Sequence, residues 1–183
     1  MNSGENMKIT NQSKAVLRLI FRVLLILMMI ATLAFAYVNS MLPPEESNKQ
    51  SGAVGNIISQ IIPPNTSIGA FVLENLRKIA HFTEFGLLGM ELAVYVFFFT
   101  ENKKRWIPVS ILLAFFAGFI DETIQMFTKR GPAIADVWID FAGCLTYSLI
   151  AYLFCYSIRG AVRFFSRQIN KKQESEKSQN GSN

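Results

Sequence analysis

The sequence predicts an all-α integral membrane protein, built as a bundle of four transmembrane helices. Hydrophobic residues make up 51% of its 183 residues. Four mostly apolar stretches, residues 15–38, 79–100, 106–127 and 133–158, are each long enough to cross a bilayer, which takes about 18 or more such residues. A soluble bundle is disfavoured because runs such as 94–99 (VYVFFF) would leave too little polar surface.

The basic residues are unevenly distributed around these stretches, and the net charge is +5. The larger group precedes or enters the first stretch, fills the second connection or follows the fourth stretch: Lys8, Lys14, Arg18, Arg22, Lys103, Lys104, Arg105, Arg159, Arg163, Arg167, Lys171, Lys172 and Lys177. Because basic residues accumulate in cytoplasmic loops, we expect both termini in the cytoplasm and a multi-pass protein of the cell membrane. No recognition motif accompanies these residues, so we expect no nucleic-acid partner.

From the N-terminus, we expect a polar cytoplasmic tail over residues 1–13 and a membrane domain over 14–158. The first apolar stretch is longer than the core of a signal peptide, so it is interpreted as a retained anchor. After the fourth stretch, residues 159–183 form a basic cytoplasmic tail. Cys144 and Cys155 share one span about 16 Å apart, too far for a disulfide.

The outer loop, residues 39–75, is the longest connection. Within it, residues 43–46 (PPEE) predict a helix break, and 47–52 a turn. Apolar residues at helical spacing predict a short amphipathic helix over 53–62, either lying at the membrane interface or packing as a lid on the bundle. Asn65, Thr66 or Ser67 would then cap the helix that becomes the second span.

Polar and ionisable side chains interrupt the last three stretches. They are His81 and Glu84 in the second, Asp121, Glu122 and Gln125 in the third, and Asp136 and Asp140 in the fourth. Ionisable groups inside a bilayer cost a few kcal/mol each, so they persist only when paired, hydrated or used. The rise per residue places all three sets about 5–12 Å inward from the outer ends of their helices. We therefore expect them to meet at one level, in the outer half of the bilayer.

Two interpretations of this cluster are open. In the first, Arg77, Lys78, Lys129 and Arg130 form the rim of a water-filled pocket open to the outside, lined by the acidic residues and His81. In the second, the same charges form buried ion pairs that hold the helices together. A divalent cation could also bind His81 and the carboxylates, and so many oxygen ligands favour magnesium, manganese or calcium over zinc. No compact metal motif is present, so the metal content and any cofactor stay undetermined from sequence.

The same residues resemble the VanZ-like family of small bacterial membrane proteins. The resemblance rests on Lys78-x-x-His81-x-x-Glu84, Asp121-Glu122-x-x-Gln125 with Arg130, and Asp136-x-x-x-Asp140-x-x-Gly143, within residues 76–153. It departs at Asp140, where the family more often has asparagine. The resemblance implies an envelope protein, whose named relative confers low-level resistance to the glycopeptide teicoplanin.

These observations lead to an outward-facing acidic and histidine-containing pocket as the expected site. Its expected ligand is the head group of a lipid-linked cell-wall precursor, or a glycopeptide that targets this precursor. Two functions of other classes are also consistent with the sequence. One is a membrane enzyme that uses metal-assisted hydrolysis or transfer on a lipid substrate, and the other is a non-catalytic scaffold that contacts envelope proteins through residues 53–62.

Overall fold

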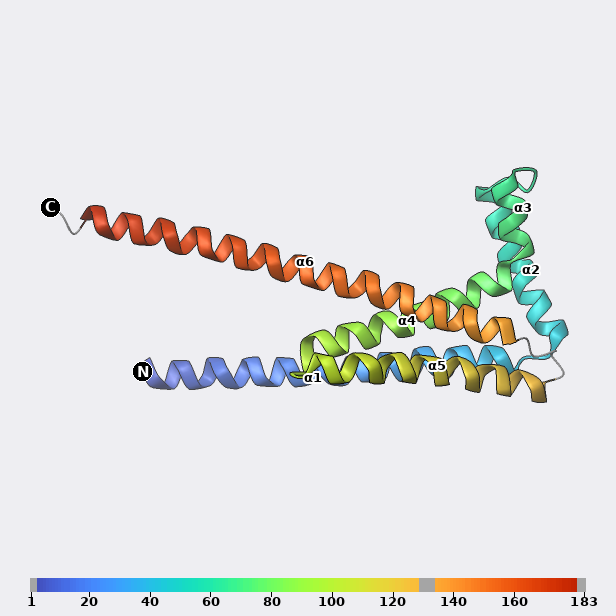
Figure 1. The fold of residues 1–183 in the computed structure, drawn as a ribbon, viewed down its shortest axis with the longest axis horizontal. Coiled ribbons are helices and arrows are strands. Elements are labelled where there is room, and N and C mark those ends of the chain that lie inside the picture. Colours follow the sequence, from blue (N-terminus) through green and yellow to red (C-terminus); the bar gives the residue numbers. More distant parts are fainter. Residues whose placement is uncertain (1–2, 129–133, 181–183) are drawn as a thin grey trace.

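The computed structural model describes residues 3–128 and 134–180, which form helices joined by short loops, with no strand among them. The elements are α1 (Ser3–Met41), α2 (Pro44–Ile61), α3 (Ser67–Glu74), α4 (Leu76–Phe99), α5 (Lys103–Phe127) and α6 (Ile134–Asn180). Figure 1 shows α1, α4, α5 and α6 running along the molecule as an elongated bundle, with α2 and α3 set across one end.

Four of the helices, α1, α4, α5 and α6, are long and apolar enough to cross a membrane, as the sequence predicts. Their outer faces carry large apolar side chains such as Leu24, Phe116 and Leu149, all exposed on the isolated chain. Lipid is the environment in which such surfaces are stable, because an exposed apolar surface of this extent would associate in water. The chain is therefore a membrane-embedded helical bundle.

Helix α4 is central to the packing, because it contacts α1, α5 and α6. Glycines allow the closest of these contacts, between α4 and α6. A Cβ atom on Gly89 would overlap the backbone of Cys144, and one on Gly143 would overlap the backbone of Phe82. Small residues let transmembrane helices approach backbone to backbone. This contact sets the distance between the two helices that carry His81 and Asp140.

The outer loop is more helical than predicted. The helix does break here as predicted, because α1 ends at Met41 and Pro43 is extended, but Pro44 then starts α2, so the predicted turn over residues 47–52 is wrong. Proline suits the first helical position because its missing N–H would have no partner there, and Glu45 and Glu46 complement the positive end of the helix dipole. Thr66 caps α3, as one of the three predicted candidates, by accepting a hydrogen bond from Gly69 N at 3.0 Å.

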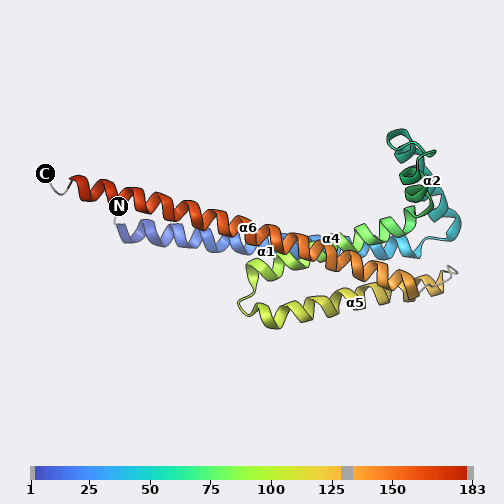
Figure 2. The ribbon, with the colours of Figure 1, turned by 45° about the horizontal axis from the view of Figure 1, so that its top comes forward.

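Helix α3 does not continue into the second span, contrary to the prediction. The helix ends at Glu74, Asn75 has φ −110° and ψ 16°, and α4 begins at Leu76. This break turns the chain, so that α2 and α3 lie across the bundle direction (Figure 2). The apolar side chains of Ile57, Ile61 and Phe71 are exposed on these two helices. Their crosswise orientation fits the interfacial alternative better than a lid.

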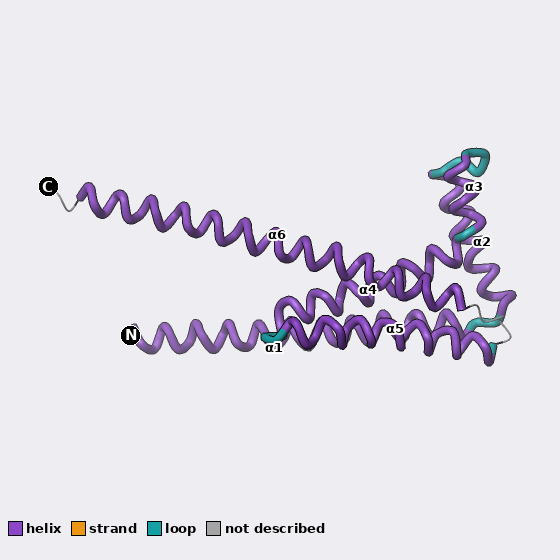
Figure 3. The backbone as a smooth tube through the Cα atoms, viewed as in Figure 1, coloured by secondary structure: helices purple, strands orange, loops and turns teal. Residues whose placement is uncertain are grey.

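The two termini lie at the same end of the bundle, opposite α2 and α3 (Figures 1 and 2). The tube in Figure 3 shows the short connection between α4 and α5 facing the terminal end, whereas the loops that flank α2 face the other end. Helix α1 starts at Ser3 and α6 continues to Asn180, so no break separates the predicted tails from the spans. The basic residues Lys103–Arg105 therefore lie towards the same end as the termini. The prediction that both termini are cytoplasmic requires this arrangement.

Candidate functional site

Helices α4, α5 and α6 bring His81, Asp121 and Asp140 together. His81 lies near the start of α4, Asp140 near the start of α6, and Asp121 near the end of α5. Because α5 runs opposite to the other two helices, all three positions fall at the same level of the bundle, at the end where α2 and α3 lie. This end is called the site end below.

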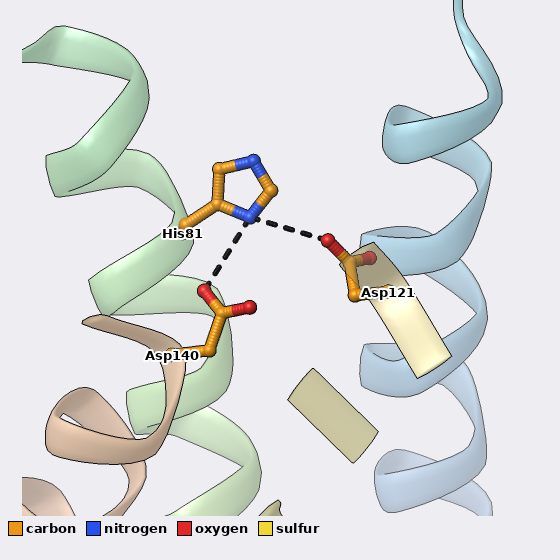
Figure 4. Close-up of side chains that lie close together, drawn as sticks. All are labelled: His81, Asp121 and Asp140. Carbon is orange, nitrogen blue, oxygen red and sulfur yellow. Dashed lines mark ion pairs between the residues drawn. The ribbon is translucent and has the colours of Figure 1, made fainter. Parts of the chain in front are cut away.

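The imidazole of His81 lies between the two carboxylates. Its Nδ1 is 3.5 Å from Asp121 Oδ2 and 3.5 Å from Asp140 Oδ1, and Figure 4 shows the three side chains converging on one point. Asp121 and Asp140 have no exposed surface, and His81 is 7% exposed. We refer to His81, Asp121 and Asp140 as the triad.

A chain of polar contacts connects the triad to the surface. Gln125 Nε2 donates a hydrogen bond to Asp121 Oδ2 at 2.8 Å, and Arg77 Nη2 in turn donates to Gln125 Oε1. The same guanidinium nitrogen lies 3.9 Å from Asp136 Oδ2, and the Arg77 side chain is 41% exposed. Gln125 therefore holds the Asp121 carboxylate in place, and Arg77 extends the network to the rim.

Helix α1 supplies polar groups that the sequence did not lead us to include. Asn39 Nδ2 donates to Glu84 Oε1 at 3.1 Å, and Ser40, fully buried, lies with its hydroxyl 3.5 Å from Gln125 Nε2. Tyr37 donates its hydroxyl to the carbonyl of Ala117 at 3.2 Å. The available signal was three polar residues within four positions at the end of an otherwise apolar span.

The remaining predicted residues take different places. Glu122 is buried beside Asp121 on α5, whereas Glu84 is half-buried and bound to Asn39. Lys78 is exposed on the turn before His81. The other two predicted rim residues, Lys129 and Arg130, lie outside the described residues.

The acidic residues are more enclosed than a pocket open to water would require. The complete burial of Asp121 and Asp140 differs from our expectation of solvated carboxylates. The reason is that α1, whose Ser40 reaches Gln125, packs against both α4 and α5. A cavity of about 510 Å³ lies next to this network, between α2, α3 and the start of α4, and Arg77 lines it. Polar side chains such as Asn48, Asn56 and Glu74 also line it.

Comparison with known proteins places this arrangement in a family. A model of the VanZ/LLP1 family matches residues 21–155. The chain belongs to the VanZ/LLP1 family. No curated protein and no solved structure matches the chain significantly. The matched region contains the triad and the α1 residues that bind Glu84 and Gln125, so the VanZ/LLP1 match extends beyond the motifs in α4, α5 and α6.

Proposed function

We propose that this VanZ/LLP1 membrane protein binds the phosphate-bearing head group of a lipid-linked envelope component at its site end, in the cell membrane. The observation that carries the proposal is the position of Arg77. Its side chain is partly exposed, lines the 510 Å³ cavity and is fixed from inside by Gln125 and Asp136. An arginine held in this way presents an oriented fork of donors, which suits phosphate oxygens.

The donors of Arg77 are not all used by the protein. Nη2 contacts Gln125 and Asp136, whereas the buried Nε has no hydrogen-bond partner among the described residues. A buried donor without a partner is costly, so a small shift of the guanidinium towards an acceptor in the cavity would be favourable. Lys78, exposed one position further along α4, adds a second positive charge at the site end.

The surroundings of the cavity fit a ligand that is part of a lipid. The helices that form its wall, α2 and α3, carry exposed Ile57, Ile61 and Phe71, and they lie across the bundle as an interfacial segment does. A head group at this level would meet Arg77 while its lipid tail stays in the bilayer. Binding of a cell-wall precursor in this way would also link the protein to low-level glycopeptide resistance, because glycopeptides act on such precursors.

The experiment that tests this proposal is lipid analysis of gently purified protein, with Arg77→Ala and Arg77→Lys beside the wild type. We expect a phosphate-bearing precursor lipid to accompany the wild type, and roughly ten-fold less of it to accompany Arg77→Ala, since the charge-assisted contact is lost. Arg77→Lys should retain an intermediate amount because it keeps the charge without the fork. Arg163→Ala, exposed near the other end of the bundle, is the matched control and should retain the wild-type amount.

In cells, Arg77→Ala should remove any teicoplanin resistance that the wild type confers, at equal protein level in the membrane. Equal lipid retention by wild type and Arg77→Ala would contradict the proposal. Purification with a fixed protein partner and no precursor lipid would favour the scaffold instead.

A further inference from the structure

We propose that the triad, His81, Asp121 and Asp140, is a binding site for one divalent metal ion that accepts both carboxylate and imidazole, Mn²⁺ or Zn²⁺. This inference goes beyond the head-group proposal and does not depend on it. It rests on the geometry of the three side chains, on their charge and on the carboxylate oxygens that the protein leaves without donors.

The distances within the triad suit coordination better than hydrogen bonding. Good N–H···O hydrogen bonds span about 2.7–3.2 Å, whereas His81 Nδ1 is 3.5 Å from each of the two carboxylate oxygens. Two ligand atoms bound about 2.1 Å from a metal ion are about 3.4 Å apart at a tetrahedral angle. One ligand atom from each triad residue lies within 4.8 Å of the other two, so one ion can reach all three.

The charge of the triad also calls for a cation. Among the described residues, no lysine or arginine forms an ion pair with Asp121 or Asp140, and His81 is the one basic partner of both. Protonated His81 would balance one carboxylate and leave the other uncompensated, which is costly in a buried site. A divalent ion beside neutral His81 would balance both.

Unpartnered oxygens point to the same conclusion. Neither carboxylate oxygen of fully buried Asp140 has a hydrogen-bond donor among the described residues, and Asp121 Oδ1 has none either. Buried polar atoms are nearly always satisfied, so such oxygens indicate a missing cation or proton. Gly118 keeps space beside Asp140, because a Cβ there would lie 3.0 Å from Asp140 Cβ and 3.4 Å from its Oδ2.

The outer contacts are those expected of a metal site. Gln125 donates to Asp121 Oδ2 and is itself held by Arg77, so one carboxylate ligand is oriented before an ion arrives. Partners of this kind typically account for ten- to 100-fold in metal affinity, roughly. The imidazole ligand makes magnesium and calcium less suitable than the sequence suggests, since both prefer sites made of oxygen alone. Of the three metals favoured by the sequence, manganese therefore remains a candidate, and zinc becomes a second one because it binds imidazole well.

The test is metal analysis of the full-length protein purified in mild detergent, followed by removal of metal with EDTA and titration with Mn²⁺ and Zn²⁺ separately. We expect about one ion per chain in the wild type and tight rebinding of one of the two metals. Asp140→Asn should weaken binding at least ten-fold, and Asp121→Asn by more, since each removes a charged ligand. Glu91→Gln changes a buried carboxylate outside the triad and should bind metal as the wild type does.

Wild-type protein that carries no metal and binds neither ion at millimolar concentration would overturn the proposal, and the triad would then be a proton-balanced ion pair. Equal binding by wild type, Asp140→Asn and His81→Gln would overturn it as well. If Asp121→Asn fails to accumulate, the wild type and Asp140→Asn still decide the result. Because the readout is bound metal, its failure would leave the lipid result for Arg77 unaffected.

Discussion

The two ends of the bundle differ in where their charged side chains lie. At the site end, carboxylates of Asp121 and Asp140 are buried inside, and polar residues from α1, α4, α5 and α6 surround them. At the terminal end, the charges lie outside and contact aromatic rings. Arg22 Nη2 donates to the Tyr95 hydroxyl at 2.8 Å, and the guanidinium carbon lies 5.6 Å from the centre of the ring.

Phe97 extends this pattern at the terminal end, with Lys103 Nζ at 4.9 Å and Arg159 Cζ at 5.4 Å from the centre of its ring. The interior beside it is apolar, with a cavity of about 290 Å³ lined by residues such as Val96, Ala114 and Leu145. Cations on aromatic rings at a helix end are explained by anchoring at the membrane surface. Anchoring does not explain buried acids, and among the described residues Asp121 and Asp140, the two fully buried carboxylates, both lie at the site end.

The largest effect should come from the contact that positions the site end. Gly143→Ala places a Cβ against the backbone of Phe82, which cannot rotate away, and should lower the free energy of unfolding by about 3 kcal/mol. Gly160 lies on the same helix with no heavy atom within 4 Å of a new Cβ, so Gly160→Ala should match the wild type or exceed its stability by up to about 1 kcal/mol. Reversible unfolding in detergent measures both. Equal stability of the two variants would show that α4 and α6 do not approach as described.

A smaller effect should follow from Gln125→Leu. This change removes the donor to Asp121 and the acceptor of Arg77, and it leaves buried polar groups unpaired, at roughly 2 kcal/mol. Glu91→Gln is the matched comparison from α4, because an amide can still accept the hydrogen bond that Thr32 donates at 2.9 Å. The same unfolding assay should show Glu91→Gln close to wild type. A larger loss for Glu91→Gln than for Gln125→Leu would remove the distinction between the site end and the rest of the core.

The smallest effect is expected at the terminal end. Tyr95→Phe removes the hydroxyl that Arg22 contacts but keeps the ring, so we expect a loss of about 0.5 kcal/mol or less. The loss should change little with salt, because the hydroxyl that is removed carries no charge. Unfolding at two salt concentrations tests this, and a loss above about 1 kcal/mol, more than an exposed hydrogen bond is expected to contribute, would count against the contrast between the ends.

The four spans and the shared level of His81, Asp121 and Asp140 could be predicted because both follow from local rules. An apolar run of sufficient length predicts a span, and the rise per residue gives its depth. The contribution of α1 could not be predicted in this way. Asn39 and Ser40 are uncharged and follow an apolar run, and their role depends on which face α1 turns towards α4 and α5.

The enclosure of the acidic residues was missed for the same reason. Burial of Asp140 depends on backbone contacts at Gly118 and Gly143 and on the packing of whole helices, none of which a spacing rule contains. The break at Asn75 was missed because nothing in the residues around it forbids a continuous helix. It places α2 and α3 across the bundle and so forms the cavity beside Arg77.

The central claim is that Asp121 and Asp140, buried at the site end, bind a cation and are not only ion pairs that hold the helices together. The most direct measurement is the change in unfolding temperature when Mn²⁺ or Zn²⁺ is added to EDTA-treated protein, for the wild type, Asp140→Asn and Glu91→Gln. We predict a rise of several degrees for the wild type and for Glu91→Gln with one of these ions, and no rise for Asp140→Asn, because only an ion bound to the folded triad stabilises it. No rise in the wild type, or the same rise in all three proteins, would contradict the account.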